Sequence, residues 1–187
     1  MRAVLQKVAQ ASVTVGDRIV GSIGAGVCVL VGISHDDTPD DMEYIARKIL
    51  NLRVFDDPSG MWKKSVMDAR LQVLCVSQFT LYGKTTKGMK PDFHDAMKSE
   101  KSRQFFNDFV ECLGRMYEKD KIQTGEFGAM MQIALVNDGP VTLELDSRKF
   151  SYDQADPVQA AKAAAKLAAK EQRRSKYEQK NVESPLR

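Results

Sequence analysis

The first 33 residues hold the feature that most restricts the fold. Short runs rich in β-branched residues cover most of this stretch, and glycines punctuate them, among them Gly16, Gly21, Gly24 and Gly26. Short runs of this kind, bounded by glycine, are typical of antiparallel strands. The expected strands are, in chain order, 4–9, 12–15, 18–23 and 26–33. We expect them to form a meander, with the last and most apolar strand in the centre of the sheet.

Two later stretches have apolar residues at helical spacing. The first follows Thr38-Pro39, a capping hydroxyl and a proline at the first helical position, and acidic residues occupy its first turn. The second runs from about Ser99 to Glu118 and repeats aromatic and aliphatic residues three and four positions apart. We therefore expect two amphipathic helices that each bury one face.

The rest of the chain predicts further strands. They are expected at 71–81, 128–136 and 141–145, with a polar loop from 82 to 93 and a tight corner at 137–140 that joins the last two strands as a pair. Strands with two inserted helices indicate the α+β class. We expect mainly antiparallel sheets that form a barrel-like or sandwich-like body with two main helices.

Composition separates a body from a tail. We expect one domain at 1–150 and a tail at 151–187 that is rich in Ala and Lys, helical or disordered. From Ala155 onward the chain has eight basic and four acidic residues, a net charge of +4, so the remainder carries −1 of the total of +3. A nearly neutral body is not suited to long nucleic acid, because such binding neutralises many phosphates, but it can hold one terminal nucleotide.

The opening residues and the cysteines indicate the compartment. Polar residues interrupt every apolar run at the N-terminus, so we expect neither a signal peptide nor a membrane contact, and we place the protein in the cytoplasm with the nucleus left open. Three widely spaced cysteines, Cys28, Cys75 and Cys112, lie in apolar stretches and predict reduced core thiols. We expect no metal and no cofactor.

The sequence contains no P-loop, no glycine-rich dinucleotide motif, no G-x-S-x-G and no H-E-x-x-H. One segment nevertheless interrupts the apolar pattern of its predicted strand. Ser77-Gln78-Phe79-Thr80 places three polar side chains at the end of this strand. Ordinary alternation at the rim of a sheet explains this pattern. The functional alternative is that hydroxyls, an amide and neighbouring backbone N–H groups polarise a carbonyl, as an oxyanion site does.

A second segment, Asn137 to Thr142, contains Asn, Asp, Gly and Pro, which any turn uses. A Gly139-Pro140 bond between two strands is also a place where a cis peptide can be housed. The alternative to a plain turn is therefore a rigid corner whose fixed carbonyls serve recognition.

Over about residues 1 to 147, the chain resembles the D-aminoacyl-tRNA deacylase family. The segments that carry the resemblance are Gln6-Lys7-Val8, Ala11-Ser12-Val13, Ser77 to Leu81, Lys87 to Pro91, Thr124 to Ala129 and Asn137 to Thr142. The resemblance implies hydrolysis of the ester bond of D-aminoacyl-tRNA, and of glycyl-tRNA mischarged on tRNA-Ala, with rejection of L-aminoacyl-tRNA. One position departs from the family, which commonly has Arg where this chain has Lys7. The change matters because lysine cannot make the bidentate contact of a guanidinium group.

The resemblance also implies roles for particular residues and a partner. It implies a homodimer with active sites at the subunit interface, in which each Gly-cisPro corner enters the other subunit's pocket and the acceptor end of the tRNA binds there. The implied catalytic residues are Ser77, Gln78, Phe79 and Thr80. The implied substrate-binding residues are Asn137, Gly139 and Pro140, with Phe127, Gly128 and Ala129 for the terminal adenine. Lys87 and Lys90 are candidates for phosphate contacts, although exposed loop lysines often contact nothing.

Two chemical and two functional alternatives stay open. Either the ribose 2′-hydroxyl of the substrate or the hydroxyl of Thr80 can assist the attacking water. A nucleic-acid-binding or scaffolding dimer that acts through the basic tail is the rival function. An esterase for small molecules is disfavoured, because no standard triad is visible.

Overall fold

The computed structural model describes residues 1–148, and the predicted tail and its boundary at 150 lie outside the described residues. The elements in chain order are β1 (Arg2–Val15), β2 (Arg18–Ile23), β3 (Gly26–Gly32), α1 (Pro39–Asn51), β4 (Phe55–Asp57), β5 (Gly60–Lys64), β6 (Gln72–Ser77), the 3-10 helix η1 (Phe79–Tyr82), α2 (Ser99–Met116), the 3-10 helix η2 (Lys119–Lys121), β7 (Ile122–Thr124) and β8 (Gln132–Asp146). Within this range no helix is long and apolar enough to cross a membrane.

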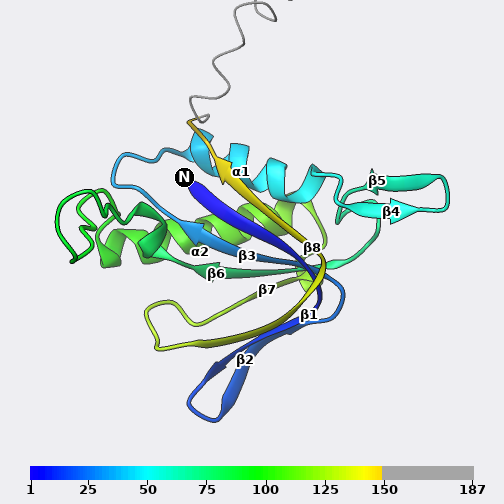
Figure 1. Ribbon diagram of the computed structural model, residues 1–187, viewed down its shortest axis with the longest axis horizontal. Coiled ribbons are helices and arrows are strands. Elements are labelled where there is room, and N and C mark those ends of the chain that lie inside the picture. Colours follow the sequence, from blue (N-terminus) through cyan, green and yellow to red (C-terminus); the bar gives the residue numbers. More distant parts are fainter. Residues whose placement is uncertain (149–187) are drawn as a thin grey trace, which may run out of the picture. The chain divides into compact units, whose positions relative to one another are not determined.

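Six strands form one curved sheet in the order β2-β1-β3-β6-β7, and β8 pairs with the other edge of β1 (Figure 1). β1 is antiparallel to β2, β3 and β8, whereas β3, β6 and β7 are parallel neighbours. Both helices contribute to the main core, where Ile45 of α1 and Phe109 of α2 are fully buried. The expected α+β class with a barrel-like sheet and two main helices is confirmed.

The expected meander is wrong, because β1 is a single long strand and both β2 and β3 pair with it. Two of the early glycines are not turn residues but allow strands to approach closely. A Cβ on Gly21 would lie 2.2 Å from the carbonyl oxygen of Thr124, and one on Gly26 would lie 2.0 Å from that of Gln72. Gly21 lies inside β2 and Gly26 is the first residue of β3, and both mark places where backbones pack closely.

The two predicted helices are confirmed with small shifts at their ends. At the start of α1, the Asp41 carboxylate accepts hydrogen bonds from the backbone N–H and the hydroxyl of Thr38, both at 2.9 Å. These two hydrogen bonds satisfy the backbone N–H and the hydroxyl of the residue that precedes the helix, where N–H groups lack acceptors within the helix.

Two strand predictions need correction. β6 ends at Ser77 rather than Leu81, because the chain turns there into η1. The last two predicted strands are one strand, β8, and both of its halves pair with β1 rather than with each other. β1 is long enough to pair with β8 on both sides of the predicted corner. The segment at 137–140 therefore interrupts the pairing of β1 with β8 instead of closing a hairpin.

An ion cluster fixes the end of β8. The Arg148 guanidinium lies 2.6 Å from Asp36 Oδ1 and 2.9 Å from Asp37 Oδ1. Hydrogen bonds from Arg148 and from the hydroxyl of Ser34 hold the pKa of Asp36 well below its ordinary value. The described part of the chain therefore ends at an anchored residue.

Candidate functional site

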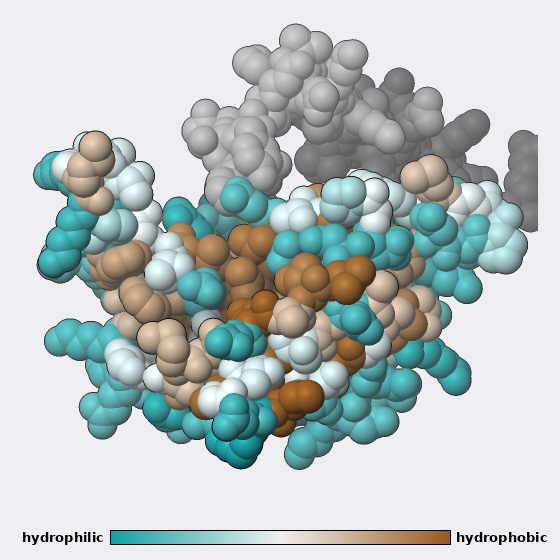
Figure 2. Space-filling view, turned by 60° about the horizontal axis from the view of Figure 1, so that its bottom comes forward, coloured by the Kyte–Doolittle hydropathy of each residue, from teal (hydrophilic) through white to brown (hydrophobic). Residues whose placement is uncertain are grey.

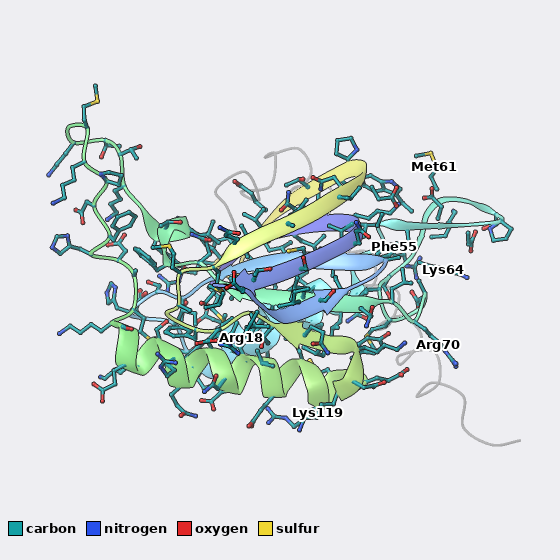
Figure 3. All side chains as sticks on the ribbon, turned by 90° about the horizontal axis from the view of Figure 1, so that it is seen from below. Arg18, Phe55, Met61, Lys64, Arg70 and Lys119 are labelled. Atoms are coloured by element: carbon teal, nitrogen blue, oxygen red, sulfur yellow. The ribbon has the colours of Figure 1, made fainter. Side chains whose placement is uncertain are left out.

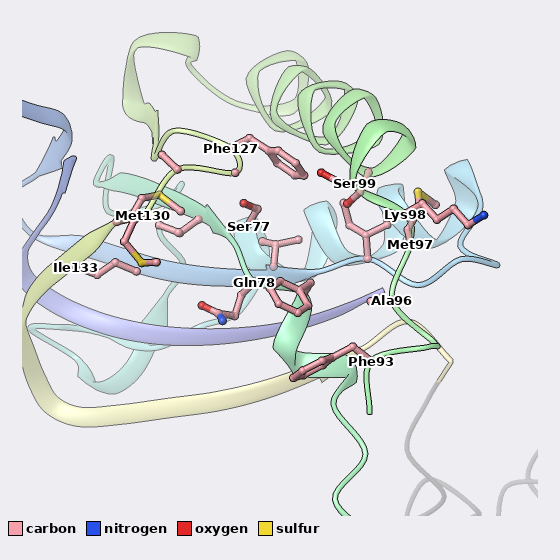
Figure 4. Close-up of a pocket in the computed structure, with 18 residues that line it drawn as sticks. Ser77, Gln78, Phe93, Ala96, Met97, Lys98, Ser99, Phe127, Met130 and Ile133 are labelled. Atoms are coloured by element: carbon pink, nitrogen blue, oxygen red, sulfur yellow. The ribbon is translucent and has the colours of Figure 1, made fainter. Parts of the chain in front are cut away.

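A cavity of about 660 Å³ lies at the carboxyl ends of the parallel strands β3 and β6. Its walls come from these strand ends, from the segment that follows β6, from residues 93–99 before and at the start of α2, and from the turn at 127–131 (Figure 4). Parallel strands that end together commonly place the loops after them around one binding site.

The segment after β6 forms one side of the cavity. Ser77, Gln78 and Phe79 line it, and Phe79 is 57% exposed. The Gln78 backbone N–H donates to the carbonyl of Val31 at 2.7 Å, which holds the segment against β3 just before η1 begins. Thr80 is exposed and is not a lining residue, and its hydroxyl accepts a hydrogen bond from Gln78 Nε2 at 2.6 Å. The structure therefore brings three of the four predicted residues directly to the cavity and leaves Thr80 behind Gln78.

A tight turn forms the facing wall. The Ala129 N–H donates to the carbonyl of Glu126 at 3.2 Å, and Gly128 has a φ of 81°. This is the pattern of a type II turn, which requires a positive φ at its third residue and therefore favours glycine there. Phe127 occupies the second position, and Phe127, Gly128 and Ala129 all line the cavity as predicted.

The sequence did not single out several other lining residues. They are Phe93, Met97, Lys98, Ser99, Ser102 and Met130. Ser99 and Ser102 lie three positions apart, a spacing that places them on the same face of the predicted helix, and this was the available signal. Among the described residues that line the cavity, Lys98 is the only ionisable one, so their side chains offer no carboxylate or imidazole as a base.

The predicted corner is an outward loop in the β1–β8 ladder. Asn137 pairs with Val8 and Thr142 pairs with Gln6, so residues 138–141 all lie opposite Lys7. This corner segment is mostly exposed, and its Gly139-Pro140 peptide bond is cis.

Lys7 contacts the corner through a residue next to the glycine. Its Nζ lies 3.0 Å from Asp138 Oδ2, and its side chain is only 13% exposed. The same ammonium lies 5.4 Å from the ring centroid of Phe55, which lies where the β4–β5 hairpin joins the sheet (Figure 3). The Asn137 amide donates weakly to the Lys7 carbonyl at 3.4 Å. A lysine therefore braces this corner through a carboxylate, in place of a bidentate arginine contact.

The corner and the cavity of one chain are far apart. Val8 pairs with Gly26, which pairs with Gln72 at the start of β6, so the corner lies beside the strand starts. Ser77 lies five residues further along β6, which is about 17 Å for a rise of about 3.3 Å per residue. None of Asn137, Gly139 and Pro140 lines the cavity.

The loop that carries Lys87 and Lys90 is exposed, and neither lysine lines the cavity. A backbone bridge between Lys84 and Asp92 closes this loop. The Lys84 ammonium lies 2.7 Å from Asp95 Oδ2, and this hydrogen bond raises the pKa of Lys84. The role of Lys87 and Lys90 in phosphate binding stays a prediction.

Large apolar side chains are exposed near the cavity and on β8. Phe79 is 57% exposed, Met130 is 91% exposed and Val136 is 49% exposed. The space-filling view shows hydrophobic residues gathered across one face with hydrophilic residues around them (Figure 2). Exposed apolar surface of this kind commonly marks a site of interaction.

Comparison with known proteins identifies the family. The profile described as D-Tyr-tRNA(Tyr) deacylase matches residues 4–146. The chain is 50% identical over 177 residues to "D-aminoacyl-tRNA deacylase 1" of Homo sapiens, which covers 94% of this chain and 84% of that protein. It is 54% identical over 147 residues to "D-aminoacyl-tRNA deacylase" of Drosophila melanogaster, covering 79% of this chain and 92% of the relative.

Two solved structures have the same fold. The "c-Myc DNA Unwinding Element Binding Protein" is 54% identical, with a TM-score of 0.75 over 78% of this chain and 98% of that one. A "probable eukaryotic D-amino acid tRNA deacylase" is 20% identical, with a TM-score of 0.68 over the same shares, and this likeness concerns the fold alone. On the profile match and the sequence identities, the chain belongs to the D-Tyr-tRNA(Tyr) deacylase family and is a hydrolase.

Proposed function

We propose that this chain hydrolyses the ester bond between a D-amino acid and the terminal ribose of tRNA. The observation that carries the proposal is the cavity between Ser77–Phe79 and the Phe127 turn, in a chain that belongs to a deacylase family. One wall offers polar groups for an ester carbonyl, and the other offers an aromatic ring for the terminal base. The reaction belongs in the cytoplasm, where aminoacyl-tRNA is used.

The chemistry relies on position rather than on a strong base. The backbone N–H groups of Phe79 and Thr80 open η1, and the first N–H groups of a helix have no acceptor within it, so they are suited to polarise the ester carbonyl. Water attacks the carbonyl carbon, the ester C–O bond breaks, and the ribose oxygen leaves with a proton. The vicinal 2′-hydroxyl assists the water, because no residue of 1–148 that lines the cavity presents a carboxylate or imidazole for this task.

The corner acts on the site of a second copy of the chain. In its own chain the corner lies about 17 Å along the sheet from Ser77, at a strand rise of about 3.3 Å per residue, so it does not reach that cavity. In a homodimer, carbonyls of Gly139-Pro140 accept hydrogen bonds from the substrate ammonium. An L side chain held by the same contacts clashes with the corner backbone, whereas a D side chain points to solvent. Glycine has no side chain to clash, so glycyl-tRNA, including glycyl-tRNA-Ala, is also a substrate.

The test of the activity is hydrolysis of matched D-tyrosyl-, L-tyrosyl- and glycyl-tRNA by the purified protein. Release of the D-amino acid and of glycine, with the L-ester intact, is the expected result. Hydrolysis of the L-ester at the rate of the D-ester would refute the stereochemical filter, and no hydrolysis of any of the three would refute the activity.

The cross-subunit arrangement has a separate test by complementation. One variant carries Ala129→Trp, which fills the cavity, and another carries Gly139→Val, which alters the corner. Each is expected to be inactive alone, and mixed dimers regain activity because they contain one intact cavity and one intact corner on different chains. Absence of recovery in dimers that are shown to be mixed would place both segments in the same chain's site.

A second candidate function is nucleic-acid binding by a dimer through the basic tail. The name of the solved relative with 54% identity refers to a DNA unwinding element and favours DNA binding in general, because 98% of that chain matches 78% of this one. The tail carries a net charge of +4 from Ala155 onward, which suits phosphate binding. Removal of the residues after Arg148 keeps the ion cluster with Asp36 and separates the two functions. Unchanged deacylation with lost DNA binding would assign the tail to a separate activity.

A further inference from the structure

Arg103, in the second turn of α2, packs on the turn that carries Phe127. Its guanidinium carbon lies 4.9 Å from the centroid of the Phe127 ring. A Cβ on Gly128 would lie 3.3 Å from Arg103 Nη2, so the guanidinium also lies close to the backbone of that glycine. The sequence did not indicate this contact, because the residues lie on elements that are distant in the chain.

The turn is held from two sides at consecutive residues. Glu126 forms an ion pair with Arg18 of β2 at 3.2 Å, and Phe127 lies under the guanidinium of Arg103. Glu126 is 49% exposed and Arg18 is 72% exposed, so solvent weakens that pair. The contact between Arg103 and Phe127 is the one that acts directly on the ring.

Neighbours from α2 contact the Phe127 ring without lining the cavity. Phe106 packs against it with a centroid distance of 5.9 Å and an interplanar angle of 46°. Phe127 itself lines the cavity, whereas Arg103 and Phe106 do not. Figure 4 shows the ring reaching from its turn toward the start of α2, where Ser99 lies. The helix therefore supports the ring from behind, and the remaining ring surface is available to a ligand in the cavity.

We propose that Arg103 is a positioning residue that holds the Phe127 ring as the stacking surface for the terminal base of the substrate. This inference rests on the proposed function and deepens it. A planar guanidinium can lie over an aromatic ring and restrict it, which an ammonium does less well. Because the cation draws ring electrons toward itself, the opposite face becomes better suited to stack on an electron-rich purine. Arg103 acts on binding through Phe127 and does not touch the reacting atoms.

The rival explanation for any effect of Arg103 is general attraction of tRNA phosphates. Lys101 provides the matched control, because it is exposed in the first turn of the same helix and Lys101→Met removes the same charge. We therefore compare Arg103→Met, Arg103→Lys, Lys101→Met, Phe127→Leu and the double variant Arg103→Met/Phe127→Leu. KM and kcat are measured with D-tyrosyl-tRNA, and the Kd of adenosine 5′-monophosphate is measured by calorimetry.

Arg103→Met is expected to raise KM and the nucleotide Kd roughly three- to tenfold, the range of a partly exposed cation–π contact, with kcat nearly unchanged. Arg103→Lys gives a smaller rise, and Lys101→Met changes neither constant by more than about twofold. In the Phe127→Leu background, Arg103→Met adds nothing, because its effect passes through the ring.

Two outcomes would overturn this role. Equal losses in Arg103→Met and Lys101→Met would assign the effect to charge alone, and full additivity with Phe127→Leu would separate Arg103 from the ring. A wild-type protein that binds the nucleotide but hydrolyses no D-aminoacyl-tRNA would refute the proposed function, while the nucleotide Kd values would still decide the role of Arg103.

Discussion

The cavity and the corner are held by their own chain in opposite ways. The cavity lies on the main core, and its Phe127 wall packs against α2 through Phe106 and Arg103. The corner at 138–141 is mostly exposed, and its side-chain contacts include one ion pair with Lys7. This difference teaches that packing within the chain fixes the walls of the cavity, whereas the corner is fixed mainly by its neighbours on β1 and is open to solvent.

The largest expected effect is on stability, and it separates the two regions. Phe106 is 3% exposed and packs against both Phe109 and Phe127. Phe106→Ala is therefore expected to lower the free energy of unfolding by about 3–5 kcal/mol, through lost burial and the cavity left behind. Asp138→Ala, the matched change in the corner, is expected to cost less than about 1 kcal/mol. Urea denaturation measures both, and similar costs would erase the difference in how the regions are held.

The second effect concerns Lys7, which is nearly buried and joins the corner to the body of the chain. Lys7→Met removes the ion pair with Asp138, so the corner loses its orientation and deacylation is expected to fall about tenfold, equivalent to about 1.4 kcal/mol. Discrimination between D- and L-tyrosyl-tRNA is expected to fall as well, with stability changed by less than about 1 kcal/mol.

Asp138→Asn is the control for this brace, because it keeps the shape of the partner and removes its charge. We expect it to show the same direction of change as Lys7→Met, and the double variant to show little more than either one. Full activity of Lys7→Met would mean that the corner holds its position without Lys7.

The sequence predicted the elements better than their pairing. The spacing of apolar residues located α1 and α2, because an amphipathic helix leaves a local pattern. It did not show that β2 and β3 share β1 or that β8 follows β1 throughout, because pairing depends on partners distant in the chain. Gly21 and Gly26 stood out only as interruptions of β-branched runs, although they make room for the backbones of Thr124 and Gln72, which only the folded sheet brings near.

The candidate site shows the same contrast between residues that local sequence indicates and residues that only the folded chain brings together. The polar residues at the end of β6 stand out locally, whereas the residues at 127–129 were indicated only by the family resemblance, and both segments line the cavity. Met97, just before α2, lines the cavity, and Arg103 of α2 packs on the Phe127 ring, but neither residue carries a local signal for this site. The partner of Lys7 was equally hidden, since Asp138 lies far from it in sequence.

A smaller effect is expected for Thr80, whose hydroxyl accepts from Gln78 and does not line the cavity. Thr80→Ala removes one hydrogen bond that orients Gln78, so kcat is expected to fall by less than about tenfold, in line with the loss of one neutral hydrogen bond. Thr80→Ser, which keeps the hydroxyl, is the control and should be nearly as active as the wild type. Single-turnover kinetics measure this, and a drop near 10⁴-fold in Thr80→Ala would instead indicate direct use of the hydroxyl in catalysis.

The smallest expected effect is the reactivity of the buried cysteine thiols in the sheet that carries the cavity. Burial raises the pKa of Cys28 from about 9 to about 11, and burial also raises that of Cys75. Between about pH 9 and pH 11, the folded state keeps the Cys28 proton whereas the unfolded chain loses it. The contribution of the protonated Cys28 to stability is therefore complete below pH 9 and is lost as the pH rises through 11. At pH 8 the native protein is therefore expected to react with almost none of its thiols in an assay with Ellman's reagent.

The Asp138→Cys variant provides the matched probe of the corner, where the side chain is 54% exposed. It is expected to add one thiol that reacts within minutes, while the native cysteines stay protected. Dimer formation adds a further distinction, because a corner inserted into a partner is covered at high protein concentration and uncovered on dilution. Because Asp138→Cys also removes the ion pair with Lys7, dimer formation by the variant is measured by ultracentrifugation at the same concentrations. A new thiol that reacts at the same rate in the monomer and in the dimer would show that the corner stays in solvent, and the cavity would then have to select its substrate without it.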